Sequence, residues 1–410
     1  MVVFVSNYLN HHQIPFCHSM YELLKGDFTF IQTEPMEEER IKMGWNQQLS
    51  FPYLRYYYQE PEKCKALILA AKVVLFGGCD DERYIEARLH AKKPVIRISE
   101  RLYKTGQWKA ISPRGLKKKY HDHTGYRKDQ VYLLCAGAYV PSDFSIVHAY
   151  PGKMYRWGYF PETKHYDIEE LLKQKGWLTD DKSSKTCVPY ILWAARMIPW
   201  KHPELPIKVA KYLKNKGLDF HMEIIGGGVM EEQIKALRKE YGLEDVVTMP
   251  GFMPPEKVRE SMEKADIYLF TSDREEGWGA VANESMNSGC ALVANHMIGA
   301  VPYLVKHGEN GLIYRDGNMV ELFQQTEKLV RDPELCRKLG RQAYQTITGC
   351  WNAETAAARL IRLSCQLGIL DSDSVIPGLP DEIPEDEGPC TPAPVTAERK
   401  MYGQLTASNN

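Results

Sequence analysis

The amino-acid sequence predicts an α/β protein with two doubly wound parallel sheets, one in each half of its 410 residues. Short β-branched runs alternate with helix-length segments almost from end to end, which is typical of βαβ units. The runs are apolar throughout, as expected of strands that helices cover on both faces. At roughly 100 to 200 residues per domain, the chain is long enough for two to three domains.

The first half carries strand candidates at residues 2–5, 28–31, 73–76, 95–98 and 131–135, and the segment 154–160 closes it. Helix-length segments such as 81–92 separate them. We therefore expect a first domain over residues 1–170. The polar run DDKSSK at 180–185 is typical of a surface connector, so we assign 171–188 to a linker.

The second half repeats the alternation. Its strand candidates lie at 190–194, 221–225, 246–249, 267–270, 291–294 and 312–314, which predicts a second domain over residues 189–349. The helical pattern at 353–367 predicts a terminal helix within 350–370. From 371 to 410 the chain is acidic and rich in proline, so we expect a disordered tail that cannot bury enough apolar surface to fold.

The composition excludes a wholly disordered chain and a collagen-like chain. Hydrophobic residues make up 44% and charged residues 26%, as in ordinary globular proteins. With 52 Lys and Arg against 53 Asp and Glu, the net charge of −1 gives no general attraction to nucleic acid or anionic membrane. Any site for a polyanion must therefore be local.

Cysteine spacing and hydropathy suggest the compartment. The ten cysteines are scattered singly, without the paired spacing of a zinc site or the density of a disulfide scaffold. No apolar run approaches the roughly 20 residues that span a bilayer. Met1 leads directly into a strand candidate with no charged segment before it. We expect a cytoplasmic protein with reduced thiols.

The most informative segment runs from Glu275 to Val293, between the strand candidates at 267–270 and 291–294. It therefore forms a loop and helix at the carboxyl edge of a parallel sheet, where open α/β folds bind ligands. Gly277 and Gly279 allow close approach of the backbone. A helix that begins near Gly279 would direct its amides at an anion, and a diphosphate suits this position.

Two carboxylates flank these glycines. Glu276 lies in the loop and Glu284 about two turns into the helix, so one can face a sugar while the other accepts hydrogen bonds from ribose hydroxyls. Neither needs to hold a metal. A solvated helix with surface glutamates is the alternative, but it fits poorly with the glycines, Trp278 and the alanine-rich helix that starts at Ala280.

The string EEGWGAVANESMNSGCALVA, with Glu-x7-Glu from 276 to 284, resembles the donor-site motif of retaining GT-B glycosyltransferases of the family 4 type (glycosyltransferase group 1). The resemblance covers roughly residues 188–345. It implies the GT-B fold, with two Rossmann-like domains facing a central cleft and a terminal helix within 350–370 that crosses back to the first domain. It also implies transfer of a sugar from a nucleoside diphosphate donor, UDP- or GDP-linked, to a glycan, lipid-linked or small-molecule acceptor, with retention at the anomeric carbon.

The segment 194–203 follows the first strand of the second domain and resembles the part of the family that binds the donor diphosphate. Arg196 offers a planar fork of donors and Lys201 a compact charge, and both suit pyrophosphate oxygens. An Arg and a Lys five residues apart are more often surface charges. Their place after a buried strand favours the binding role.

Weaker signals of a nucleotide site lie in the loops after the next two strands. Gly227 belongs to a Gly-rich turn after strand 221–225, and the corresponding loop of the family lies near the nucleotide. Phe252 and Met253 follow a Pro-Gly and resemble the segment whose backbone contacts the base. A plain turn explains them equally well. The loop 298–302 resembles a glycine-containing loop that reaches the donor in the family.

The first half departs from the family. The loop after its first strand holds Asn7, His11, His12 and Gln13 instead of the usual glycines. These side chains could bind acceptor hydroxyls or donor phosphate, and His12 could assist proton transfer, although an ordinary turn with two histidines is about equally consistent. Ser99 and Glu100 stand where many relatives carry a histidine.

Residues 101–128 are strongly basic, with interleaved aromatic side chains and one acidic residue, Asp122. This segment could contact anionic lipid headgroups or a pyrophosphate-linked lipid, which would place the protein peripherally on the inner face of the membrane. A solvated helix face is the alternative. Nucleic acid is less favoured because no recognised module accompanies the charge.

We expect no cofactor or metal. The one Asp-x-Asp, at 371–373, falls in the predicted tail, so Arg196 and Lys201 would stabilise the departing diphosphate. Two other functions stay open: an epimerase or phosphorylase of the same fold, and a non-catalytic protein that binds sugar nucleotides.

Overall fold

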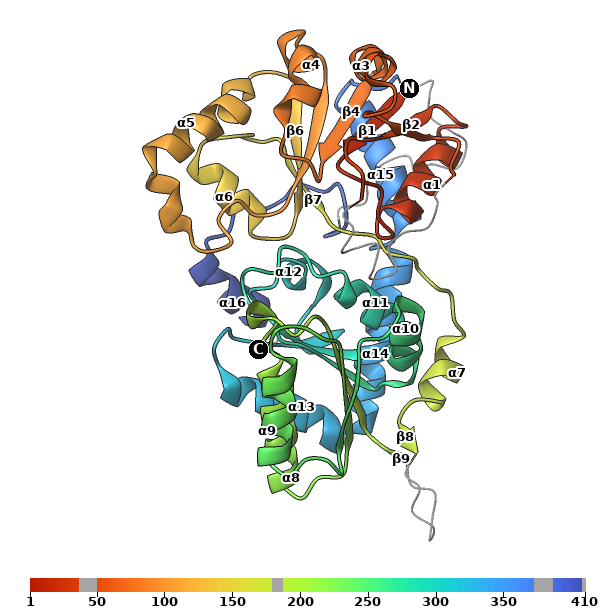
Figure 1. Ribbon diagram of the computed structural model, residues 1–410, viewed down its shortest axis with the longest axis vertical. Coiled ribbons are helices and arrows are strands. Elements are labelled where there is room, and N and C mark those ends of the chain that lie inside the picture. The colour runs from red at the N-terminus through yellow and green to blue at the C-terminus, as the bar shows by residue number, and fades with distance from the viewer. Residues whose placement is uncertain (37–49, 179–186, 372–385, 408–410) are drawn as a thin grey trace. The chain divides into compact units, whose positions relative to one another are not determined.

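The computed structural model describes residues 1–36, 50–178, 187–371 and 386–407. The chain divides into two compact units (Figure 1). The first unit comprises Met1–Glu162 and Cys350–Ala397, and the second comprises Thr163–Gly349 and Glu398–Asn410. Each unit contains one large parallel sheet with helices, so the predicted α/β fold class is confirmed.

The first unit is built on a seven-stranded sheet of order β3-β2-β1-β4-β5-β6-β7. All neighbouring strands are parallel. The strands are β1 (Val2–Ser6), β2 (Phe28–Gln32), β3 (Leu54–Tyr56), β4 (Val73–Gly77), β5 (Val95–Ser99), β6 (Val131–Ala136) and β7 (Met154–Trp157). The helices are α1 (Ile14–Leu23), α3 (Pro61–Ala70), α4 (Glu86–His90), α5 (Pro113–Asp122), α6 (Val140–Ile146) and α15 (Ala353–Gln366).

Successive side chains of β1 point to opposite faces of this sheet, and both faces are covered by helices. Val3 and Val5 belong to a core that includes residues of α3, α4 and α6. Phe4 points the other way and packs edge-to-face on Phe16 of α1, with the ring centroids 6.3 Å apart. Helix α15 packs against α1, so the segment that returns from residue 350 completes the second face.

The second unit has a six-stranded parallel sheet of order β12-β11-β10-β13-β14-β15. Its strands are β10 (Tyr190–Ala194), β11 (His221–Ile225), β12 (Val247–Gly251), β13 (Ile267–Phe270), β14 (Ala291–Asn295) and β15 (Gly311–Tyr314). Its helices are α7 (Ile168–Lys173), α8 (Glu204–Asn215), α9 (Glu231–Glu240), α10 (Pro255–Lys264), α11 (Val281–Asn287), α12 (Val301–Leu304), α13 (Met319–Arg331), α14 (Pro333–Gly349) and α16 (Glu398–Thr406). Strands β8 (Trp177–Leu178) and β9 (Cys187–Val188) form a short antiparallel pair.

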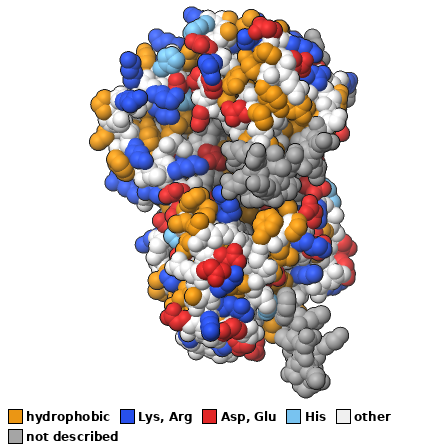
Figure 2. Space-filling view, viewed as in Figure 1, with side chains coloured by type: hydrophobic (Ala, Val, Ile, Leu, Met, Phe, Trp, Pro, Cys, Tyr) orange, Lys and Arg blue, Asp and Glu red, His pale blue; other side chains and the backbone are white. Residues whose placement is uncertain are grey.

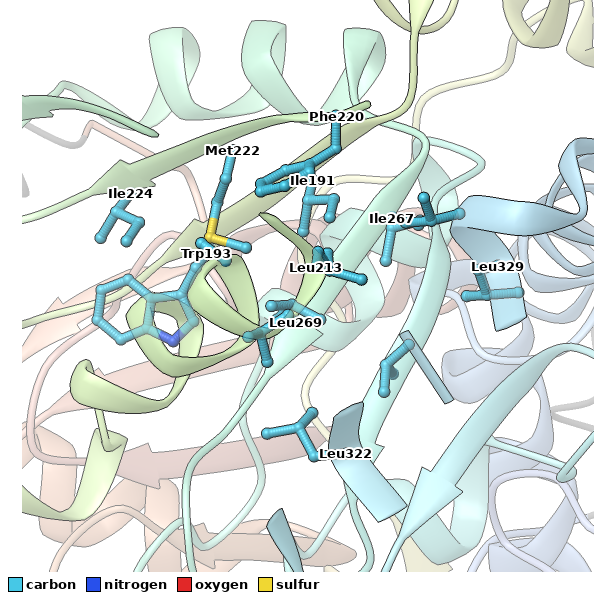
Figure 3. Packing of buried hydrophobic residues seen from close by; sticks show 14 of the residues in the cluster. Ile191, Trp193, Leu213, Phe220, Met222, Ile224, Ile267, Leu269, Leu322 and Leu329 are labelled. Carbon is cyan, nitrogen blue, oxygen red and sulfur yellow. The ribbon is translucent and has the colours of Figure 1, made fainter. Parts of the chain in front are cut away.

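The core of the second unit lies between β10, β11 and β13 and the helices on one face. Ile191 and Trp193 of β10 pack with Leu213 of α8 and Leu322 of α13, and all are buried (Figure 3). At about 25 cal/mol per Å² of apolar area removed from water, such clusters supply most of the driving force for folding. The rigid sheet can therefore hold loops at its carboxyl edge.

Both sheets reverse their winding direction at their first strand. In the first unit β1 lies between β2 and β4, and in the second β10 lies between β11 and β13. Consecutive crossovers on either side of such a strand diverge, which leaves a crevice at the carboxyl ends. The fold thus predicts ligand sites after β1 and β4 and after β10 and β13.

The tail requires a correction. The sequence predicts disorder from residue 371, but described residues 386–407 pack on the rest of the chain. Asp386 accepts two hydrogen bonds from Arg359, at 2.7 and 2.6 Å, Cys390 is buried, and α16 follows. Composition misleads here because these partners are distant in sequence. Residues 372–385 lie outside the described residues.

Domain limits also differ from the predicted ones. The first unit ends at Glu162 and not at 170, and α7 and β8 belong to the second unit. Part of the predicted linker, 179–186, lies outside the described residues. Among the helices that the structure describes, none is long and apolar enough to cross a membrane.

Candidate functional site

Two segments meet at the carboxyl edge of the second sheet, one after β10 and one after β13. The indole N–H of Trp193 donates to Oγ1 of Thr271 at 2.8 Å, and that hydroxyl donates to the carbonyl of Lys201 at 2.7 Å. The amide of Asp273 donates to the carbonyl of Trp200 at 3.0 Å. Buried bonds of this kind fix the turn that carries Lys201 against the loop 271–280.

Lys201 and Glu276 form an ion pair across this junction. Both side chains are only 14% exposed. The Lys201 ammonium can bind an anionic group of a ligand, and the Glu276 carboxylate can accept a hydrogen bond from a ligand hydroxyl. A ligand that offers both groups could therefore replace the ion pair. The structure thus brings together two of the predicted site residues.

Arg196 lies on the same turn but is exposed. Its guanidinium lies 5.9 Å from the ring centroid of Trp200, a distance that suits a cation–π contact. The stacking restricts the side chain without neutralising it. Arg196 can therefore still offer its planar fork of donors to an anion.

His202 was not predicted as a site residue. It adopts a left-handed conformation with φ of 50°, and its two ring nitrogens lie 3.1 Å from Asp273 Oδ2 and 3.1 Å from Glu204 Oε1. These hydrogen bonds, first that to Asp273 and then that to Glu204, raise the pKa of the imidazole to about 10. His202 is therefore a cation that ties the turn to the loop. A histidine between a Lys and a Pro at a strand end is the only sequence signal.

The loop between β13 and α11 depends on Gly279, whose φ is +94°. A Cβ at this position would lie 2.3 Å from Cζ of Phe270, so no other residue fits without movement. The amides of Gly299 and Ala300 donate to the carbonyls of Glu276 and Trp278, both at 3.2 Å. The loop 298–301 thus supports the glycine loop from behind.

Amide groups of this loop are available to a ligand. No described residue accepts a hydrogen bond from the amide of Gly279 or Ala280. Gly277 and Trp278 are buried, and the Trp278 indole donates to Oδ1 of Asn283 at 2.9 Å. The Trp278 side chain therefore fills the interior of the loop, and contact with a ligand is left to the backbone.

Glu284 lies on α11, which begins at Val281. Its side chain is half-buried. Desolvation raises the pKa of the carboxyl to about 7, and the charge of Arg259 opposes the shift. Glu284 is thus a mixture of neutral and ionised forms at neutral pH.

The predicted Gly227, Phe252 and Met253 also lie at this edge. The amide of Met197, after β10, donates to the carbonyl of Gly227 at 2.8 Å, and the amide of Gly226 donates to Gly251 at 2.9 Å. Phe252 is 61% exposed, and Met253 is half-buried. The loops that follow β10, β11 and β12 are therefore joined side by side, with an apolar ring facing solvent.

The first unit has its own hollow. A cavity of about 680 Å³ opens at the carboxyl ends of β1, β4 and β5. Among the residues that line it are Asn7, His12, Gly78, Glu100 and Tyr159. Glu100 accepts hydrogen bonds from Tyr159 at 2.5 Å and from Lys104 at 2.6 Å. The residue that stands in place of the family's histidine is therefore already held by two donors.

His12 lies in this cavity wall with a half-buried side chain. Burial, and secondarily the charge of His11, lower the pKa of His12 well below its usual value. The neutral ring lies parallel to Tyr159, with centroids 6.4 Å apart. Asn7 Oδ1 accepts a hydrogen bond from the amide of Tyr8 at 2.8 Å. The structure places Asn7 and His12 in the first unit and all other predicted site residues in the second.

The basic segment 101–128 carries four exposed apolar side chains. Trp108 is 69% exposed, Ile111 80%, Leu116 41% and Tyr120 64%. They lie on the turn Gln107–Ile111 and on α5, where Figure 2 shows Lys and Arg side chains interspersed with hydrophobic ones. Large exposed apolar groups gathered within a basic surface are unusual unless something covers them.

Residues 179–346 match the family described as "Glycosyl transferases group 1". Over 139 residues the chain is 32% identical to the putative colanic acid biosynthesis glycosyltransferase WcaL of Escherichia coli, covering 33% of this chain and 34% of that protein. The chain spans less than half of the length of the curated relatives it matches.

Solved structures share the fold over most of the chain. HepE of Anabaena, solved with UDP, superimposes with a TM-score of 0.63 at 14% identity and covers 90% of this chain and 100% of that one. A mutant of TarM from S. aureus, solved with UDP and sugars, gives 0.60 at 11% identity and covers 90% and 99%. The protein therefore has the GT-B fold, with two parallel-sheet Rossmann-like domains, and its residues 179–346 are similar to the group 1 glycosyltransferases.

Proposed function

We propose that the protein is a retaining glycosyltransferase of family 4 that moves a sugar from a nucleoside diphosphate to an acceptor hydroxyl. The observation that carries the proposal is the Lys201–Glu276 ion pair at the point where the second sheet reverses its winding. The match of residues 179–346 to group 1 glycosyltransferases supports it.

The donor diphosphate would bind between the turn after β10 and the glycine loop. Its negative charge would draw Lys201 from Glu276 and engage Arg196, while the amides of Gly279 and Ala280 would donate to its oxygens. Charge builds on the diphosphate as the glycosidic bond breaks, so these donors stabilise the transition state more than the ground state. The Glu276 carboxylate, released from Lys201, would accept a hydrogen bond from a hydroxyl of the transferred sugar.

The transfer step breaks the bond between the anomeric carbon and the diphosphate oxygen. The acceptor oxygen forms its bond to the same face of that carbon, and the acceptor proton passes to the departing phosphate oxygen. The products are the glycosylated acceptor and the nucleoside diphosphate. We propose that no metal takes part, since Arg196 and Lys201 supply the positive charge that the leaving group needs.

The cavity of the first unit is our proposed acceptor site. Because the pKa of His12 is low, the imidazole is neutral and a weak base, which favours hydrogen bonding to an acceptor hydroxyl over removal of its proton. Asn7, Gln13 and the Glu100–Tyr159 pair add further polar contacts. Such a set suits a polyhydroxylated acceptor, a glycan or the sugar of a lipid-linked intermediate.

Several relatives act in polysaccharide synthesis by their names, among them those for colanic acid and amylovoran. We propose a comparable role in cell-surface polysaccharide or glycoconjugate synthesis for this protein. The basic surface at 101–128 would then hold the enzyme on an anionic membrane near a lipid-linked acceptor.

The experiment begins with a thermal-shift panel of UDP-, GDP- and ADP-sugars, because a ligand that binds only the native state raises its stability. Release of the nucleoside diphosphate is then measured with the donor that binds. We expect Glu276→Gln and Lys201→Met each to lower kcat by about 10² or more, as for loss of a group that stabilises transition-state charge.

Glu275→Gln is the matched control. Glu275 is the exposed neighbour of Glu276, and the same change of charge there should leave kcat within about twofold, as a solvated carboxylate contributes little. Equal activity of Glu276→Gln and Glu275→Gln would reject the proposal. The anomeric configuration of the product is then determined by NMR. A configuration equal to that of the donor sugar shows retention, and the opposite configuration shows inversion.

A further inference from the structure

The chain continues beyond α15, the last helix that the resemblance anticipates. Residues 386–397 belong to the first unit and run along its edge strand β7. The amide of Arg156 donates to the carbonyl of Thr391 at 2.8 Å, and the amide of Cys390 donates to the carbonyl of Arg156 at 2.8 Å. An antiparallel bridge joins Tyr155 and Pro392. This end of the segment is therefore anchored by backbone hydrogen bonds.

The following residues, Glu398–Thr406, form α16 and belong to the second unit (Figure 1). Tyr402 of α16 donates to Glu321 Oε2 at 2.9 Å, and its ring lies 4.6 Å from the Arg315 guanidinium. The ring also packs edge-to-face on His296 at 5.3 Å, and Met401 is buried. Helix α16 is thus seated by several different contacts.

These contacts locate α16 on the sheet. His296 directly follows β14, and Arg315 directly follows β15. Because all strands of this sheet are parallel, both residues lie at its carboxyl edge, as do Lys201 and Glu276. Helix α16 therefore covers the ends of β14 and β15, on the side of the sheet edge next to β13 and the proposed donor loop.

The first residue of α16 reaches that loop. Glu398 forms an ion pair with Arg274, which lies two residues before Glu276. The Glu398 side chain is 18% exposed and the Arg274 side chain 36%. Among the described residues, Glu398 is the only one with a hydrogen bond to the Arg274 guanidinium, and Nε of Arg274 is buried without a partner. The loop 271–280 is thus held by β10 on one side and by α16 on the other.

We propose that Glu398 is a positioning residue of the donor site: through Arg274 it fixes the loop that carries Glu276 and the amides of Gly279 and Ala280. This inference rests on the proposed function. A loop that must order on binding lowers donor affinity, because part of the binding free energy is spent on ordering it. Glu398 therefore acts on donor binding and leaves the bond-breaking step to other groups.

The test compares Glu398→Gln, Arg274→Glu, the charge-swapped double variant Arg274→Glu/Glu398→Arg, and Lys400→Gln. Lys400 is an exposed residue of the same helix and serves as the control. Hydrogen–deuterium exchange of peptides that cover 271–280 is measured without substrate, and KM and kcat are measured with the donor.

We expect Glu398→Gln to speed exchange of the loop and to raise the donor KM about fivefold, as for loss of one charge-assisted hydrogen bond, with kcat within about twofold. The double variant should recover most of both effects. Unchanged exchange, unchanged KM, a fall in kcat alone, or failure of the double variant to recover would each overturn the inference. If the wild type transfers no sugar, the proposed function fails, whereas the exchange measurement still decides whether Glu398 holds the loop.

Discussion

The role expected of Glu284, to accept hydrogen bonds from the ribose hydroxyls of the donor, sets a condition on donor binding. Desolvation raises the pKa of its carboxyl to about 7, so the group is close to half ionised at neutral pH. A ribose hydroxyl donates hydrogen bonds, and the ionised carboxylate accepts them better than the neutral acid. Donor binding should therefore favour the ionised form, and a neutral Glu284 should release its proton to solvent when the donor binds.

This linkage predicts a pH-dependent donor affinity. As pH rises from 6 to 8, the ionised fraction of a group with a pKa near 7 increases roughly tenfold, and the donor KM should fall by about the same factor. The sugar nucleotide itself has no group that titrates in this range. Glu284→Gln should give a KM that stays flat from pH 6 to 8, and a slope equal to that of the wild type would show that another group is responsible.

Lys201 and Glu276 illustrate a different residue-scale effect. Each compensates the charge of the other, and both side chains are only 14% exposed, so neither charge is buried without a partner. In the proposed function the donor separates this pair, and its phosphate oxygens then bind Lys201 while a sugar hydroxyl binds Glu276. The pair therefore holds both groups in place at the carboxyl edge of the sheet.

At the scale of elements, the site depends on loops that touch each other at one sheet edge. Gly226 directly follows β11 with φ of +138°, and a Cβ there would lie 1.9 Å from the carbonyl oxygen of Ala195. That carbonyl belongs to the strand end that leads to Arg196. Only glycine lets the loop after β11 approach the loop after β10 so closely.

Gly226→Ala should therefore lower stability by about 3 kcal/mol, from backbone strain together with the overlap, and should weaken donor binding by moving Arg196. Gly217→Ala is the control, because Gly217 also has a positive φ of 65° but nothing within 4 Å of an added Cβ. That variant should lose only about 1 kcal/mol and bind the donor normally. Denaturant unfolding and donor titration measure both effects, and equal losses in the two variants would contradict the role given to the overlap.

The same scale shows what the sequence can predict. Every strand candidate of the second domain is a strand of the structure, because buried parallel strands are continuous apolar runs. Strand β3 was missed since it has only three residues, and Leu54–Tyr56 carries no such run. Residues 386–407 were predicted to be disordered, yet their order depends on Arg359, Arg156 and Arg315, which are far away in sequence.

The candidate site divides in the same way. Lys201 and Glu276 could be singled out because each lies in the segment that follows a recognisable strand, β10 for Lys201 and β13 for Glu276. Their contact, and the hydrogen bonds of His202 with Asp273 and Glu204, depend on the order in which strands pair and could not. The contribution of Glu398 was equally hidden, because an acidic residue in a proline-rich tail has no local pattern that distinguishes it.

At the scale of the whole molecule, the chain passes between its two units after Glu162, Gly349 and Ala397. Each unit has its own hydrophobic core, and the predicted site residues are divided between them. Net charge is close to zero, so any attraction to a charged partner must come from one part of the surface. The basic segment at 101–128 is the strongest such surface that the sequence offers.

This surface predicts binding to anionic vesicles. Its Lys and Arg side chains each contribute about 1 kcal/mol near an anionic bilayer, and Trp108 and Ile111 are exposed enough to insert among the lipids. Co-sedimentation with vesicles containing phosphatidylglycerol should be strong, should weaken as salt rises because the Debye length shortens, and should be absent with purely zwitterionic vesicles.

Replacing Trp108 and Ile111 by serine separates the apolar contribution to vesicle binding from the contribution of the Lys and Arg charges. Trp108→Ser/Ile111→Ser should lower vesicle binding by more than about tenfold, since each side chain contributes about 1.5 to 3 kcal/mol when buried, while transfer to a water-soluble acceptor stays unchanged. Tyr58→Ser is the matched control, because Tyr58 is an exposed aromatic residue of the same unit, outside the segment. Equal binding of both variants and the wild type, or binding that ignores lipid charge, would show that α5 is a solvated helix and that the enzyme reaches its acceptor without this surface.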